Sequence, residues 1–213
     1  MQKIKNFFYN KKLQDLLFIF FLSLTPLLWF RKNEVIVGHD NVFALNPIIF
    51  LAGRLSTWVE HGFGQGQDLI MGTAMIHLID AIPYSLGLSL QATEIVVYIF
   101  WFFCIGVSAY ILSLQFLGQS RYFRLLAVIL YQFNFFLLQA WWIGERTKFS
   151  AYIALPLILT VFLKVYRGEL KVIHGAIINT LILFIFNAGG IYGIPLYGGM
   201  FIILGIFILF FSL

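Results

Sequence analysis

The sequence predicts an all-α protein, a polytopic transmembrane helical bundle with a large first extracytoplasmic loop that contains two interfacial helices. Two observations lead to this fold class. Hydrophobic residues make up 61% of the 213 residues and charged residues only 11%, whereas a soluble domain carries about a quarter charged residues. The hydrophobic residues also occur in runs of about the length needed to cross a bilayer. The chain is therefore expected to be an integral, multi-pass protein of the plasma membrane, with the lipid bilayer as its surroundings.

The first hydrophobic run follows a short basic N-terminus. Residues 1–12 contain four lysines and are predicted to be cytoplasmic, and residues 13–30 are predicted to form the first span. This run is longer than the hydrophobic region of a cleaved signal peptide. It ends in Trp29-Phe30-Arg31-Lys32, and an aromatic pair followed by charge is typical of a membrane interface. We expect an uncleaved signal anchor.

Residues 94–213 are predicted to hold about five further spans, at roughly 94–117, 123–142, 150–166, 172–190 and 196–213. Segment 69–90 is ambiguous, because it is long enough to cross but contains His77, Asp80 and Pro83. A charged residue near the middle of a bilayer costs about 3 kcal/mol on insertion scales.

The distribution of lysine and arginine decides how segment 69–90 is interpreted. If it does not span, the cytoplasmic segments carry nine of these cations and the outer segments five; if it spans, the numbers become six and eight. Cytoplasmic loops carry the excess of lysine and arginine, which favours the first topology. Residues 31–93 are then one outer loop. The chain forms a single transmembrane domain over 1–213, which we interpret as a fragment or as the N-terminal module of a longer protein.

Two helices are predicted within the outer loop. Asn46-Pro47 supplies an N-cap and a proline at the first helical position, and apolar residues recur at helical spacing from Ile48 to Val59, with Glu60 on the polar side. Such an amphipathic helix suits the headgroup region. Glycines between 62 and 66 are expected to end it, and segment 69–88 is predicted to be the second surface helix.

The outer loop also gathers the polar residues that could carry chemistry. Asp40 follows Gly38-His39 about ten residues after the first span. A carboxylate held there could act as a general base, and partial burial would raise its pKa towards neutrality; alternatively, Asp40 starts a helical turn. The loop further contains the ingredients of a metal site, but their spacing matches no zinc motif, and no metal is predicted. The histidines and carboxylates that could in principle hold a metal are His39, His61, His77, Asp40, Glu60, Asp68 and Asp80.

A second outer segment places a carboxylate and two cations beside Trp141-Trp142, namely Glu145, Arg146 and Lys148. One interpretation is an interfacial aromatic belt with snorkelling cations. The other is that Arg146 or Lys148 binds phosphate at the outer surface. Nucleic-acid binding is excluded, because the basic residues behind the net charge of +5 are scattered in short loops and form no stripe. Amides within the predicted spans, such as Gln132 and Asn134, are expected to bond between helices.

Several short motifs, in their order and spacing, resemble the GT-C superfamily of polyprenyl-phosphate-dependent glycosyltransferases. The closest likeness is to the N-terminal membrane module of the α-(1→3)-arabinofuranosyltransferase type, with YfhO-like membrane proteins nearby. The motifs are Gly38-His39-Asp40, Ser56-Thr57-Trp58 before the glycine cluster, Ser108-Ala109-Tyr110 after Gly106, Tyr131-Gln132-Phe133-Asn134, and ERTKFSAYIALP from Glu145 to Pro156. They cover most of the chain, although the soluble carbohydrate-binding parts common in that family are absent from it.

The resemblance implies a membrane glycosyltransferase module of the cell envelope. Asp40 matches the acidic residue that the family uses as general base, and the donor would be a polyprenyl-phosphate sugar, with a glycan as acceptor at the outer face and inversion at the anomeric carbon. Substrate binding would involve His39, Arg54, Trp58, Glu145, Arg146 and Lys148. No cofactor is implied beyond the donor substrate. A further membrane or carbohydrate-binding subunit is an expected type of partner. The alternative is a non-enzymatic membrane protein: a transporter, a lipid-handling subunit or an inactive relative.

Overall fold

A computed structural model describes residues 11–36, 43–56, 58–59, 65–66, 73–117, 120–137 and 146–186, together with 198, 199, 202 and 205. For residues 58, 59, 65, 66, 146 and 147 it describes the backbone only. In this part of the chain the regular elements are helices, apart from one antiparallel pair of two-residue strands. The elements are α2 (Lys11–Leu22), η1 (Thr25–Leu28), α3 (Pro47–Arg54), β1 (Trp58–Val59), β2 (Gln65–Gly66), α5 (Ala74–Ser85), α6 (Leu90–Phe116), α7 (Arg121–Gln132), α9 (Arg146–Tyr166) and α10 (Val172–Ile185).

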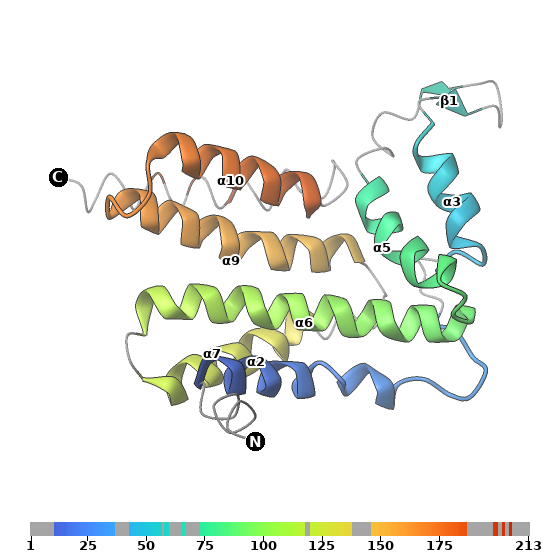
Figure 1. Ribbon diagram of the computed structural model, residues 1–213, viewed down its shortest axis with the longest axis horizontal. Helices are drawn as coiled ribbons and strands as arrows, with labels where there is room; N and C mark the ends of the chain where they lie inside the picture. The colour runs from blue at the N-terminus through green and yellow to red at the C-terminus, as the bar shows by residue number, and fades with distance from the viewer. Residues whose placement is uncertain are drawn as a thin grey trace, which may run out of the picture.

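Helix α6 is the centre of the bundle. It packs against α9 on one side and against α7 and α2 on the other, and α10 lies on α9 (Figure 1). Ser89 caps its N-terminus by accepting a hydrogen bond from the Ala92 N–H. The helix has 27 residues, which at about 1.5 Å per residue gives a length of about 40 Å. Two of its largest side chains, Trp101 and Phe102, are fully buried.

Two of the described helices are long and apolar enough to cross a membrane by length and composition. They are α6, with a mean hydropathy of 2.4 over its most apolar window, and residues Lys148–Tyr166 of α9, with 1.8. They coincide with the predicted spans 94–117 and 150–166. Because a buried core helix of a soluble protein passes the same test, the finding on its own is an all-helical fold with two apolar helices of membrane-crossing length.

The predicted first and third spans are interrupted helices. Helix α2 ends at Leu22 and a 3-10 turn containing Pro26 follows. Helix α7 ends at Gln132 instead of continuing towards 142. There the Asn134 amide donates to the Tyr131 carbonyl oxygen, and its Oδ1 accepts from the Leu137 N–H. Asparagine side chains compete in this way for backbone groups that would otherwise continue the helix.

Helices α3 and α5 both lie at the end of the bundle where α6 begins, and they pack against each other (Figure 1). The predicted cap is confirmed, because Asn46 Oδ1 accepts from the Ile49 N–H at 3.1 Å and Pro47 opens α3. The predicted second helix, 69–88, is confirmed for Ala74–Ser85, which form α5; residues 86–88 are not helical, and residues 69–72 lie outside the described residues.

The predicted extension of the first surface helix to Glu60 is wrong, because α3 ends at Arg54. Trp58 and Val59 instead form β1, in which Trp58 pairs with Gly66 and Val59 with Gln65. Aromatic and β-branched residues favour extended backbone, and the pairing satisfies backbone groups that a longer helix would have used.

Candidate functional site

The segment that leads towards Asp40 is fastened to the start of α6. The Gln91 side-chain amide donates to the carbonyl oxygens of Arg31 and Glu34, and its Oε1 accepts from the Asn33 N–H. Asn33 has a φ of 64°, a left-handed conformation that asparagine adopts more readily than most residues. Residues 31–36 therefore follow a defined turn against α6.

Glu94 completes this attachment. It is fully buried, and its Oε2 accepts from the Ile36 N–H at 2.9 Å. The described chain resumes at Phe43 and Ala44, which are both buried. The two residues on which the predicted chemistry depends most, His39 and Asp40, lie outside the described residues, between these two fixed points.

A stack of four side chains connects α3 and α5 at this end. His77 Nδ1 lies 3.4 Å from Asp80 Oδ2, one helical turn away on α5, and both residues are buried. The Phe50 ring meets the His77 ring edge-on, with 4.7 Å between centroids. The Arg54 guanidinium carbon lies 4.6 Å from the centroid of the same Phe50 ring. The stack joins a carboxylate, an imidazole, an aromatic ring and a cation.

The contacts within this stack determine the orientation of His77 and the position of the Arg54 charge. A carboxylate beside an imidazole fixes the orientation of the ring. Partial burial lowers the pKa of the Arg54 guanidinium from its ordinary value, but an arginine remains a cation at neutral pH. Arg54 is therefore a fixed positive charge at the end of the bundle where residues 31–36 attach to α6.

Lys148 supplies a second cation from the first turns of α9. Its Nζ lies 5.9 Å from the centroid of the Phe136 ring, and Phe136 stacks on Tyr152 with 5.6 Å between centroids. Both cations thus rest on aromatic rings, Arg54 on α3 and Lys148 on α9, at the end of the bundle that also holds α5 (Figure 1). Of the other predicted binding residues, Glu145 lies outside the described residues, and only the backbone is described for Trp58 and Arg146.

Among the residues with described side chains, no three histidine, cysteine or carboxylate residues come close enough together to hold a metal ion. His77 and Asp80 form a pair only, and His39, His61, Glu60 and Asp68 lie outside the described part of the chain.

Sequence reasoning missed a charged cluster at the opposite end of the bundle. Asp15 on α2 is 1% exposed; its Oδ1 accepts from Arg121 Nε at 2.6 Å and its Oδ2 accepts from the Tyr110 hydroxyl at 2.7 Å. The cluster ties α2 to both α6 and α7. The sequence did contain a sign of this cluster: Asp15 is a carboxylate at the start of an apolar run, and such a group needs a partner within the protein.

Comparison with known proteins identified no relative of this chain. No family model, no curated protein and no solved structure matches the chain. The class that the described residues define is an all-helical bundle with two helices of membrane-crossing length and polar clusters at both ends.

Proposed function

We propose that the chain is a membrane-embedded glycosyltransferase module of the GT-C type. It transfers a sugar from a polyprenyl-phosphate donor to a cell-envelope glycan at the outer face. The Asp40 carboxylate takes the proton of an acceptor hydroxyl, whose oxygen bonds to the anomeric carbon from the face opposite the donor phosphate. The carbon–oxygen bond to that phosphate breaks, the phosphate leaves with the electron pair, and the configuration is inverted.

The exposed faces of the bundle support the membrane setting. Helix α10 is mostly apolar, with His174, Asn179 and Thr180 as its polar residues, and of its residues only Gly175 is buried. Val172 is 74% exposed and Phe184 62%, and on α7 Leu130 is 63% exposed. Large apolar side chains exposed in such number on α7 and α10 are unusual on a soluble monomer, whereas lipid tails solvate them at no cost.

The charge distribution supports the orientation. Seven described lysines and arginines lie where α6 and α9 end and where α2, α7 and α10 begin: Lys11, Lys12, Arg121, Arg124, Lys164, Arg167 and Lys171. By the positive-inside rule, this excess favours a cytoplasmic position for that end. The end with α3 and α5 is then extracytoplasmic (Figure 1).

The observation that carries the catalytic proposal is the attachment of the segment before Asp40. Asp40 is four residues from Ile36, whose N–H is bonded to buried Glu94, and a chain extends at most about 3.6 Å per residue. Chain length therefore limits how far the carboxylate can lie from the end of the bundle that carries Arg54 and Lys148. Fixed cations of this kind stabilise the charge that develops on a departing phosphate.

Replacement of one carboxylate tests the proposal. The full-length protein, reconstituted in vesicles with synthetic polyprenyl-phosphate arabinofuranose, glucose or mannose and an arabinan or mannan acceptor, is expected to transfer one of these sugars. Asp40→Asn should lower the rate about a hundredfold or more, because a general base contributes about 10²–10⁴. Glu34→Gln is the matched control, since Glu34 is exposed on the same anchored segment and uses its backbone carbonyl there. Undiminished transfer by Asp40→Asn, or none by the unmodified protein, would contradict the proposal.

The orientation has its own experiment. In a Cys104→Ala background, cysteine replacing Gln65 should react with an impermeant maleimide added outside intact cells, and cysteine replacing Ser120 should react only after permeabilisation. Ser120 immediately precedes α7 at the proposed cytoplasmic end. Labelling of the Ser120 position from outside would reverse the orientation and would mean that segment 69–90 crosses the membrane.

A further inference from the structure

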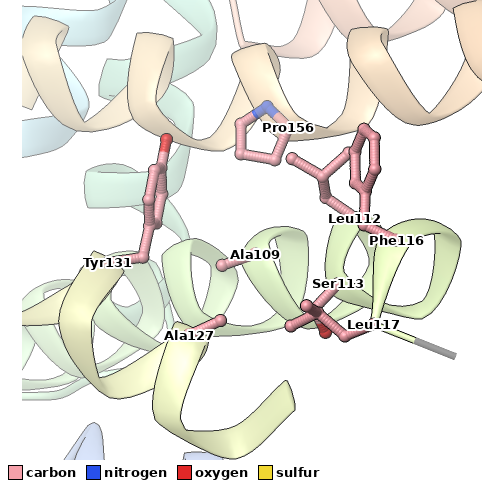
Figure 2. Close-up of a pocket in the computed structure, with 8 residues that line it drawn as sticks. All are labelled: Ala109, Leu112, Ser113, Phe116, Leu117, Ala127, Tyr131 and Pro156. Atoms are coloured by element: carbon pink, nitrogen blue, oxygen red, sulfur yellow. The ribbon is translucent and has the colours of Figure 1, made fainter. Parts of the chain in front are cut away.

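A cavity of about 230 Å³ lies between α6, α7 and α9 (Figure 2). Most of its lining comes from the last two turns of α6 and from α7, and Pro156 closes it from α9. The lining residues are Ala109, Leu112, Ser113, Phe116, Leu117, Ala127, Tyr131 and Pro156. Sites for whole small molecules usually measure about 300–1,000 Å³, so this cavity suits a segment of a chain better than a complete sugar or nucleotide.

The two hydroxyl groups of the lining are already used within the protein. The Ser113 hydroxyl donates to the Tyr110 carbonyl oxygen at 2.7 Å, and the Tyr131 hydroxyl donates to the Tyr152 carbonyl oxygen at 2.9 Å. A polar ligand would therefore leave its own acceptors unpaired inside the cavity, which is costly. A hydrocarbon chain has no such groups to lose, and it gains from the apolar lining.

The cavity reaches the charged end of the bundle. Leu117 and Phe116, at the end of α6, form part of its lining, and α7 begins at this end (Figure 1). Arg124 precedes Ala127 by three residues on α7, a spacing that puts both on one face of the helix. Lys164 occupies the last turn of α9.

The acidic groups at this end leave the balance positive. Asp15 and Glu169 are the described carboxylates there, and Asp15 is buried and paired with Arg121. A cation-rich end beside an apolar cavity complements a molecule that has a negative head and a hydrocarbon tail.

We propose that the cavity binds one acyl chain of an anionic phospholipid, with the phosphate held at the end marked by Arg124 and Lys164. The site rests on the membrane setting of the proposed function but not on sugar transfer. It lies at the opposite end of α6 from the segment that carries Asp40, so the failure of one proposal leaves the other standing.

The purified full chain in detergent tests this site by native mass spectrometry with phosphatidylglycerol and phosphatidylcholine of identical chains. Phosphatidylglycerol is expected to bind at least about fivefold more tightly, and Arg124→Gln should remove about fivefold of its affinity, because each cation near an anionic headgroup contributes about that factor. The same variant should leave phosphatidylcholine binding unchanged. Equal binding of the two lipids by the unmodified protein would overturn the assignment of an anionic ligand.

The cavity is tested by filling it. Ala127→Trp should weaken phosphatidylglycerol binding about tenfold or more, because several methylene groups lose their contacts. Leu112→Trp fills the same space from α6, so a folding defect in one variant does not decide the result. Ala176→Trp is the control, on an exposed position of α10. Unchanged binding in folded Ala127→Trp and Leu112→Trp, each with an unaltered thermal unfolding profile, would exclude the cavity as the site.

Discussion

The contact between α2, α6 and α7 at Gly106 makes the sharpest prediction about stability. A Cβ atom at this position would lie 2.5 Å from Gln132 Nε2 and 2.6 Å from Ile19 Cγ2. Neither neighbour is free to move away. Gln132 is fully buried and donates to the Phe102 carbonyl oxygen at 2.9 Å and to Ser23 Oγ at 3.3 Å, and Ile19 is fully buried in the core between the helices.

The magnitude for Gly106→Ala follows from three terms. Overpacking a buried site costs about 1–3 kcal/mol, and each hydrogen bond of Gln132 that is lost costs about 1 kcal/mol. The higher helix propensity of alanine offsets about 1 kcal/mol of this loss in stability. With both bonds lost, the net loss is about 2–4 kcal/mol, which for a chain of this length corresponds to a decrease in Tm of about 4–16 °C.

The assay is thermal unfolding of the purified protein in detergent, followed by circular dichroism. Gly53→Ala is the matched control, because Gly53 is also helical and an added Cβ would meet nothing within 4 Å; its Tm should stay unchanged or rise. A double variant with Gln132→Ala should lose less stability than the sum of the single variants, since the new methyl group occupies space that the amide vacates. A Tm for Gly106→Ala equal to that of Gly53→Ala would refute the tight packing of the three helices.

Two further predictions concern the polar contacts at the two ends of the bundle. Asp15→Asn keeps an acceptor for the Tyr110 hydroxyl but removes the charge that pairs with Arg121; unfolding should become easier by about 1–3 kcal/mol, and an unchanged Tm would show that the pair contributes nothing. Gln91→Ala removes the acceptor of the Asn33 N–H, so hydrogen–deuterium exchange at that amide should accelerate while exchange within α6 does not. Unaltered exchange at Asn33 would mean that the turn holds without Gln91.

The sequence patterns that predicted the fold correctly are local. The cap at Asn46 depends on residues within one helical turn, and the long apolar helices depend on composition over about twenty residues. The errors come from interactions that local patterns do not contain. The helix that begins at Pro47 stops early because Trp58 pairs with Gly66, and the end of α7 depends on how Asn134 uses its side chain.

In the candidate site, too, contacts between neighbours in the sequence could be predicted, and contacts between distant segments could not. The spacing of His77 and Asp80 already puts them on one face of a helix, and their contact is found in the structure. The attachment of residues 31–36 to Gln91 and Glu94 joins groups about 58 residues apart, and the pairing of Asp15 with Arg121 joins groups 106 residues apart. The hydrophobic pattern of a single sequence cannot predict such pairs, because they depend on how helices that are distant in the chain pack together.

Helix α6 separates the two proposed sites by a distance that makes them independently testable. Glu94 marks the end to which the Asp40 segment is attached, and Tyr110 lies beside the cavity and the charged cluster. From 94 to 110 there are sixteen residues of continuous helix, about 24 Å at 1.5 Å per residue, which is most of the roughly 30 Å thickness of a hydrocarbon core. No single lipid headgroup can therefore serve both ends. Ala127→Trp should weaken phosphatidylglycerol binding without changing sugar transfer in vesicles, and Asp40→Asn should lower sugar transfer without changing lipid binding. A parallel loss in both variants would show that the two ends are coupled through the bundle.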